Sequence, residues 1–159
     1  MSSVLRRLAV PATTILALVL CAGPARAQDK ASCALIEISA TNAKAPSIPP
    51  DLKPLAKKLK KPPLSSWNSF KVLSSTSLSL ETLKAGQARL ALGKASVMLR
   101  EVDRRAGKRP RLTLGVTMDD QSGKRVVDSK VVVDSGDYLV VGETLANNDG
   151  HFVALSCRL

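Results

Sequence analysis

Histidine and aromatic residues are scarce in this chain of 159 residues. It contains one Trp, one Tyr, two Phe and a single His, His151. Three cysteines and one histidine are too few for a His-rich metal site or a zinc ribbon. We therefore expect neither a metal nor a cofactor. The chain also lacks side chains that most types of enzyme reaction require.

Acidic residues are also few. The chain has 13 Asp and Glu against 24 Lys and Arg, so its formal net charge is +11. At 45% hydrophobic residues it is too apolar for an intrinsically disordered chain. The length is that of a single domain.

The first 27 residues have the pattern of a signal peptide. Arg6 and Arg7 precede an apolar run over residues 10–22, and Ala25-Arg26-Ala27 fits a cleavage site. The run is too short to span a membrane. We predict that residues 1–27 are removed and that one exported domain, residues 28–159, is periplasmic or extracellular and has no transmembrane segment.

Two cysteines remain after this cleavage, Cys33 and Cys157, one near each end of the domain. In an exported protein such a pair is typically a disulfide, which requires the first and last strands to be neighbours. A reactive cysteine would want a nearby base or a C-x-x-C pair, and the sequence has neither. Lipidation of Cys21 stays open as an alternative, although Leu20 before it does not fit a lipobox.

A period of two in the apolar residues predicts β-strands along most of the domain. The first is expected over Ser32–Ala40, and from Ser65 onward strands alternate with turns such as residues 119–123 and 147–150. At Gly93 the apolar set shifts by one residue, which predicts a β-bulge. Serines in the stretch 65–79 suggest an edge strand. We predict an all-β fold, an antiparallel β-sandwich of about seven strands.

One short helix is expected within the loop region 41–64. In Asp51–Lys61, apolar residues recur at i, i+3, i+4 and i+7, and Asp51 is placed to cap the start. The rest of the helix surface is basic: Lys53, Lys57, Lys58, Lys60 and Lys61.

A second basic tract falls in a predicted hairpin loop. It consists of Arg104, Arg105, Lys108, Arg109 and Arg111. We predict that both tracts contact an envelope protein or an anionic surface such as lipid, lipopolysaccharide or an acidic glycan. The plainer alternative is that both are merely solvated. A nucleic-acid partner is not expected, because stacking aromatics are lacking. The oligomeric state stays open.

His151 is the one candidate for a catalytic base. A Ser-His-Asp site would also need a distinguishable nucleophile, and no G-x-S-x-G motif occurs. We predict no catalytic residue and a protein that is not an enzyme, with an unrecognised hydrolase as an alternative. The acidic pair Asp119-Asp120 lacks the spacing of a calcium loop and is read as a turn.

Two stretches resemble known exported proteins. The run from Ile48 to Lys60, which begins Ile48-Pro49-Pro50-Asp51-Leu52-Lys53, and the run from Pro62 to Lys71 that follows it resemble small exported proteins of myxobacterial type. This resemblance implies a Gram-negative envelope setting and no particular activity. Val131–Gly142 is similar to strands in secretin-like outer-membrane assemblies. An accessory subunit of a secretion or surface-fibre assembly, recognised by strand addition, is therefore an alternative function.

Overall fold

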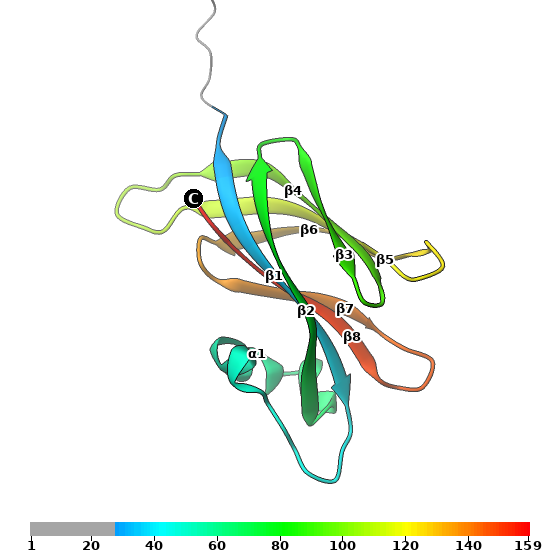
Figure 1. Cartoon of the computed structure of the whole chain (residues 1–159). Helices are drawn as coiled ribbons and strands as arrows, with labels where there is room; N and C mark the ends of the chain where they lie inside the picture. Colours follow the sequence, from blue (N-terminus) through cyan, green and yellow to red (C-terminus); the bar gives the residue numbers. More distant parts are fainter. Residues whose placement is uncertain (1–27) are drawn as a thin grey trace, which may run out of the picture.

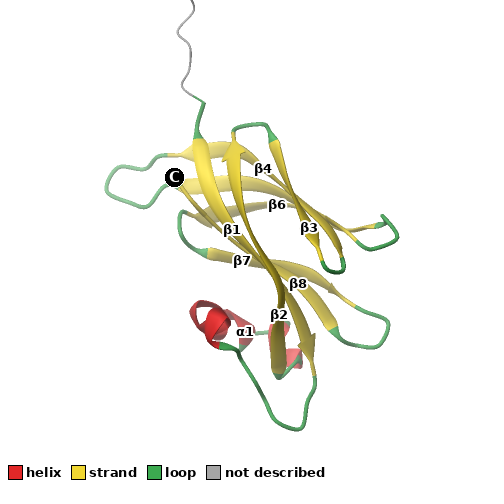
Figure 2. Ribbon diagram, in the orientation of Figure 1, coloured by secondary structure: helices red, strands yellow, loops and turns green. Residues whose placement is uncertain are grey.

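Two four-stranded antiparallel sheets pack face to face in the computed structural model, which describes residues 28–159 (Figure 1, Figure 2). One sheet has the order β2-β1-β8-β7 and the other β3-β4-β5-β6. The strands are β1 (Lys30–Thr41), β2 (Ser69–Glu81), β3 (Ala85–Leu90), β4 (Gly93–Asp103), β5 (Arg111–Asp119), β6 (Arg125–Asp134), β7 (Tyr138–Thr144) and β8 (Gly150–Arg158). The predicted all-β sandwich is confirmed. The predicted signal peptide, with Cys21, lies outside the described residues.

The sandwich has eight strands because the predicted bulge at Gly93 is a hairpin turn. Leu90 pairs with Gly93 across a two-residue turn, Ala91-Leu92, which divides one expected strand into β3 and β4. The prediction was wrong because neither turn residue is a usual turn former. Gly93 itself has φ of 142°, a backbone conformation that side chains rarely adopt.

Replacing Gly93 by alanine should destabilise the fold by about 2 kcal/mol or more. A Cβ at this position would lie 2.1 Å from the main-chain oxygen of Asp119, so the hairpin and the end of β5 would have to separate. Gly107→Ala is the matched control, because Gly107 also has positive φ and has no atom within 4 Å of its Cβ position. Urea denaturation of both variants measures the difference, and equal losses would contradict the steric explanation.

The sheet β2-β1-β8-β7 is buried on both of its faces. Its inner face packs on the second sheet, around Leu35, Leu80 and Leu155. Its outer face packs on the segment between β1 and β2, around Ile38 and Phe152. As a result, β8 is buried at every position from Gly150 to Cys157. The serine-rich strand β2 lies at the edge of this sheet, as predicted.

The segment between β1 and β2 is less regular than the predicted helix. A 3-10 helix, η1 (Pro50–Leu55), continues into a single α-helical turn, α1 (Ala56–Leu59), and a second 3-10 helix, η2 (Leu64–Ser66), follows. Asp51 makes no side-chain cap, and Pro54 inside the segment withholds an amide hydrogen. Within residues 28–159, no helix has the length and apolar character needed to cross a membrane.

Candidate functional site

Five lysines project from a segment that is anchored to the sheet by leucines. Leu52, Leu55 and Leu59 are at most 1% exposed and pack on the outer face of β1 and β8. Each leucine buried in this way contributes about 1.5–3 kcal/mol, so the segment is held in place although its helices are short. The predicted apolar stripe is therefore confirmed, and it is occupied by the protein's own sheet.

Trp67 ties the same segment to the β7–β8 hairpin. Its ring meets Phe152 edge to face, with the centroids 5.1 Å apart, and its Nε1–H donates to the main-chain oxygen of Asn148 over 2.8 Å. The leucines and this tryptophan together make a rigid base. We call the five lysines on it, Lys53, Lys57, Lys58, Lys60 and Lys61, the lysine surface.

The charges of the lysine surface are free in the part of the chain that the structure describes. All five side chains are exposed, and none lies within 4.0 Å of a carboxylate oxygen. The nearest acid in sequence, Asp51, is also exposed and makes no ion pair among residues 28–159. The positive potential here is therefore not cancelled by local pairing.

The second basic tract is different, because acids from elsewhere in the fold pair with most of it. Four of its members lie in the loop between β4 and β5, as predicted, and Arg111 is the first residue of β5. We call this tract the arginine loop. Four of its five members make ion pairs: Arg104 with Asp29, Arg105 with Asp103 and Asp134, Arg109 with Asp137, and Arg111 with Asp134. Among the described residues, Lys108 has no such partner. These pairs tie the loop to the β6–β7 turn.

Asp134 takes part in two of these ion pairs, with Arg105 and with Arg111. Partial burial raises its pKa, but hydrogen bonds and charge attraction from Arg111 and Arg105 outweigh that effect and hold the pKa below its ordinary value. The guanidinium Nη2 of Arg105 donates a hydrogen bond to the Asp134 carboxylate over 2.8 Å. Much of the positive charge of the arginine loop is therefore taken up by ion pairs within the fold.

The two basic tracts meet on one side of the molecule, although about fifty residues separate them in sequence. In Figure 1, α1 and the β4–β5 loop lie at the left, with the β6–β7 turn between them. Lys58 and Arg111 line one surface pocket of about 390 Å³ together with Asp134 and Asp137. The lysine surface is thus the unpaired part of a larger basic face.

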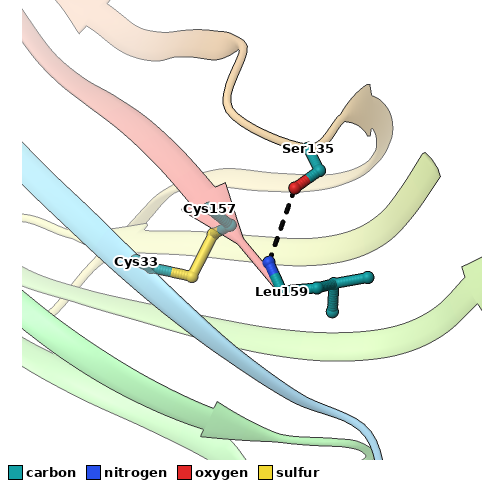
Figure 3. The surroundings of a disulfide bond; sticks show 4 residues. All are labelled: Cys33, Ser135, Cys157 and Leu159. Atoms are coloured by element: carbon teal, nitrogen blue, oxygen red, sulfur yellow. Dashed lines mark hydrogen bonds between the residues drawn. A yellow bond between two sulfur atoms is a disulfide. The ribbon is translucent and has the colours of Figure 1, made fainter. Parts of the chain in front are cut away.

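The predicted disulfide joins Cys33 to Cys157 (Figure 3). These residues are direct partners on the neighbouring strands β1 and β8, with Cα atoms 4.0 Å apart, and both are 1% exposed. The β6–β7 turn is fastened beside them, because Gly136 N–H donates to the Cys157 oxygen and Leu159 N–H donates to Ser135 Oγ. A disulfide is typical of an oxidising compartment and is compatible with export.

Glu37 forms a buried polar cluster that the sequence analysis did not identify. Its carboxylate accepts four hydrogen bonds, from Ser74 Oγ (2.6 Å), Ala91 N–H (2.7 Å), Leu92 N–H (2.9 Å) and His151 Nε2 (2.9 Å). Glu37 is on β1, whereas the two amides belong to the β3–β4 turn of the opposite sheet. The carboxylate therefore links the two layers of the sandwich.

The hydrogen bonds decide the ionisation of Glu37. Burial raises its pKa, but the bonds from Ser74, Ala91, Leu92 and His151 together outweigh burial and lower the pKa below its ordinary value. The side chain is thus a carboxylate, which can accept but not donate. It follows that Nε2 of His151 carries a hydrogen.

His151 has no catalytic geometry in this conformation. The hydrogen-bond order is Ser74–Glu37–His151, so the serine contacts the carboxylate and not the imidazole. His151 is 1% exposed and Glu37 is fully buried, and neither can meet a substrate there. The signal that could have revealed the cluster is a glutamate in line with Cys33 and Leu35 on the inner face of the first strand.

Comparison with known proteins assigns no family. No protein-family model matches the chain, and no curated protein matches it. Among solved structures, the cryo-EM structure of the T2SS secretin XcpQ from Pseudomonas aeruginosa is similar over 82% of this chain and 58% of that chain. The identity is 12% and the TM-score is 0.33, and this chain spans less than two thirds of the secretin chain. A similarity of that size does not assign a function.

Proposed function

We propose that this protein is a non-enzymatic, exported binding module that contacts an anionic component of the cell envelope through its lysine surface. The observation that carries the proposal is the contrast between the two basic tracts. Acids within the fold pair with the arginine loop, while none of the five exposed lysines of the lysine surface has a carboxylate oxygen within 4.0 Å among residues 28–159. Unpaired like charges on a rigid base repel one another and gain from an anionic partner.

The mode of contact is electrostatic. The leucines behind the lysines are already buried against the sheet, so this segment has no apolar face to insert into a bilayer. Binding then depends on the lysine charges themselves, each worth about 1 kcal/mol beside an anionic lipid surface. The same origin makes binding sensitive to ionic strength, because salt screens exposed charges over a Debye length of about 10 Å at 0.1 M.

Reversing two of these charges should weaken binding strongly. We expect Lys57→Glu/Lys60→Glu to lose about 30-fold or more in affinity for phosphatidylglycerol vesicles, since about 2 kcal/mol of attraction is removed. Vesicle co-sedimentation at low salt measures the loss. Wild-type binding should also fall as salt is raised, and phosphatidylcholine vesicles should not bind.

The matched control reverses two exposed charges at the other end of the molecule. Arg89 lies near the end of β3, and Lys124 lies in the β5–β6 turn, to the right in Figure 1. Arg89→Glu/Lys124→Glu changes the net charge by the same amount and should bind nearly as the wild type does. Equal losses in both variants, or binding that salt does not change, would contradict a specific lysine surface.

A further inference from the structure

Strand β6 leaves one edge of its sheet open. It is the terminal strand of the order β3-β4-β5-β6, and within residues 28–159 no other strand pairs with its outer edge. It is ten residues long, contains no proline and exposes 59% of Val132. Native proteins usually shorten, cover or charge such an edge, because its free N–H and C=O groups pair readily with another strand.

The regular part of β6 begins at Val127, after a register shift against β5. Val127, Ser129 and Val131 point inward, and Asp128 and Lys130 point outward and are exposed. In a strand, every second residue directs its N–H and C=O to the open edge. In two antiparallel copies related by a two-fold axis, the residues that pair must both point to the shared edge. Odd-numbered residues therefore pair with odd-numbered ones and even-numbered with even-numbered ones. This requires the axis to pass through a residue and not between two residues.

The charges of β6 select one such register. With the axis at Ser129, Asp128 faces the partner's Lys130 and Lys130 faces the partner's Asp128. Moving the axis by one residue sets either two Asp128 or two Lys130 side chains opposite each other. Moving it to Val131 sets Asp128 against the partner's Asp134. Like charges directly opposite destabilise a strand pair, whereas opposite charges stabilise it.

We propose that the open edge of β6 pairs with the β6 edge of a second copy of this chain, antiparallel and centred on Ser129. The pattern Asp128-Ser129-Lys130 is self-complementary in this register. Val127 faces the partner's Val131 in the same pairing, and Val132 lies next to the new interface. Lys130 has no ion-pair partner among the described residues, and Asp128 has only Arg125, at 3.6 Å. Both charges are thus available to the second copy.

Charge exchange on β6 tests the proposal with the purified full chain. Analytical ultracentrifugation from about 10 µM to about 1 mM should show a monomer–dimer equilibrium. Lys130→Asp and Asp128→Lys should each weaken it by about tenfold or more, because each sets like charges opposite. An equimolar mixture of the two variants should form a heterodimer, and the exchange D128K/K130D should restore the homodimer.

Arg89→Asp is the matched control, because Arg89 is exposed on β3, the opposite edge strand of the same sheet. It should dimerise as the wild type does. The proposal is overturned if the wild type stays monomeric up to about 1 mM. It is also overturned if K130D and D128K leave the dimer affinity unchanged, or if the two single variants form no heterodimer when mixed. Thermal melting of each variant shows that it is folded. The outcome is independent of vesicle binding, since neither position belongs to the lysine surface.

Discussion

Glu37→Ala should lower the free energy of unfolding by about 3–5 kcal/mol, the largest effect that we expect from a single substitution. The variant leaves four donors without their acceptor: the buried Nε2–H of His151, and the partly buried hydrogen bonds from the hydroxyl of Ser74 and the amides of Ala91 and Leu92. An unsatisfied buried donor costs about 1–3 kcal/mol, and partial relaxation reduces the sum. Urea denaturation followed by circular dichroism measures the loss.

Glu37→Gln provides a second variant in case the alanine variant does not fold. The amide has nearly the same volume, but it offers one acceptor oxygen in place of two. One carboxylate oxygen accepts from Ser74 and the Ala91 amide, and the other from the Leu92 amide and His151. The NH₂ group of glutamine must therefore face one of these two pairs of donors, so we expect a loss of about 2–3 kcal/mol. The control is Glu81→Gln on β2. Glu81 is 29% exposed, and its partners among residues 28–159 are the exposed Lys30 and Lys84, so its replacement should cost much less than that of Glu37.

The acid dependence of stability distinguishes ionised Glu37 from a merely space-filling side chain. Its pKa is lowered in the folded state, so the unfolded chain takes up the proton first as pH falls. The stability from Glu37 is fully present above the unfolded pKa of about 4.3 and is lost as pH falls through the lower folded pKa. The difference in unfolding free energy between wild type and E37Q should therefore shrink below about pH 4. A constant difference would contradict the ionised state.

Removal of the disulfide should have the next largest effect. We expect Cys33→Ala/Cys157→Ala to lower the free energy of unfolding by about 2–5 kcal/mol. The bond closes a loop with a sequence separation of 124, so in the chain-entropy model it strongly restricts the unfolded chain. It also joins the ends of β1 and β8, the two central strands of their sheet. Urea denaturation with and without reductant measures the loss.

Reductant itself supplies the control for the disulfide. Wild-type protein in reductant should approach the stability of the double variant, and the double variant should not respond to reductant. Mass mapping after alkylation in denaturant should find Cys33 and Cys157 unmodified unless a reductant was added first. Alkylation of both residues without reductant would contradict the bond, whatever the state of Cys21.

Local sequence patterns were sufficient for much of this architecture. Alternating apolar residues indicated the strands, and Asn147-Asn148-Asp149-Gly150 indicated the β7–β8 hairpin, where Asn148 adopts a positive φ of 65°. The leucine spacing in 51–61 indicated which residues are buried, although the backbone there is mostly 3-10 helix. The positions of Cys33 and Cys157 indicated the pairing of the first and last strands. Each of these depends on neighbours in sequence or on a single covalent constraint.

The tertiary structure decided the features that depend on distant residues. The turn at Ala91-Leu92 has no local turn former, and its two amides are satisfied by Glu37, more than fifty residues earlier. Most positive charges of the arginine loop are paired within the protein, because Asp29, Asp134 and Asp137 reach the loop from other parts of the fold.

The few acidic residues of the chain are distributed unevenly between the two basic tracts. Four of the few carboxylates neutralise the arginine loop and one is buried between the sheets, while none lies within ion-pair distance of the lysine surface among residues 28–159. The number of positive charges and the segments on which they lie follow directly from the amino-acid sequence. Which of them stay free was decided by folding, because charge pairing depends on distances in space and not on separation along the chain.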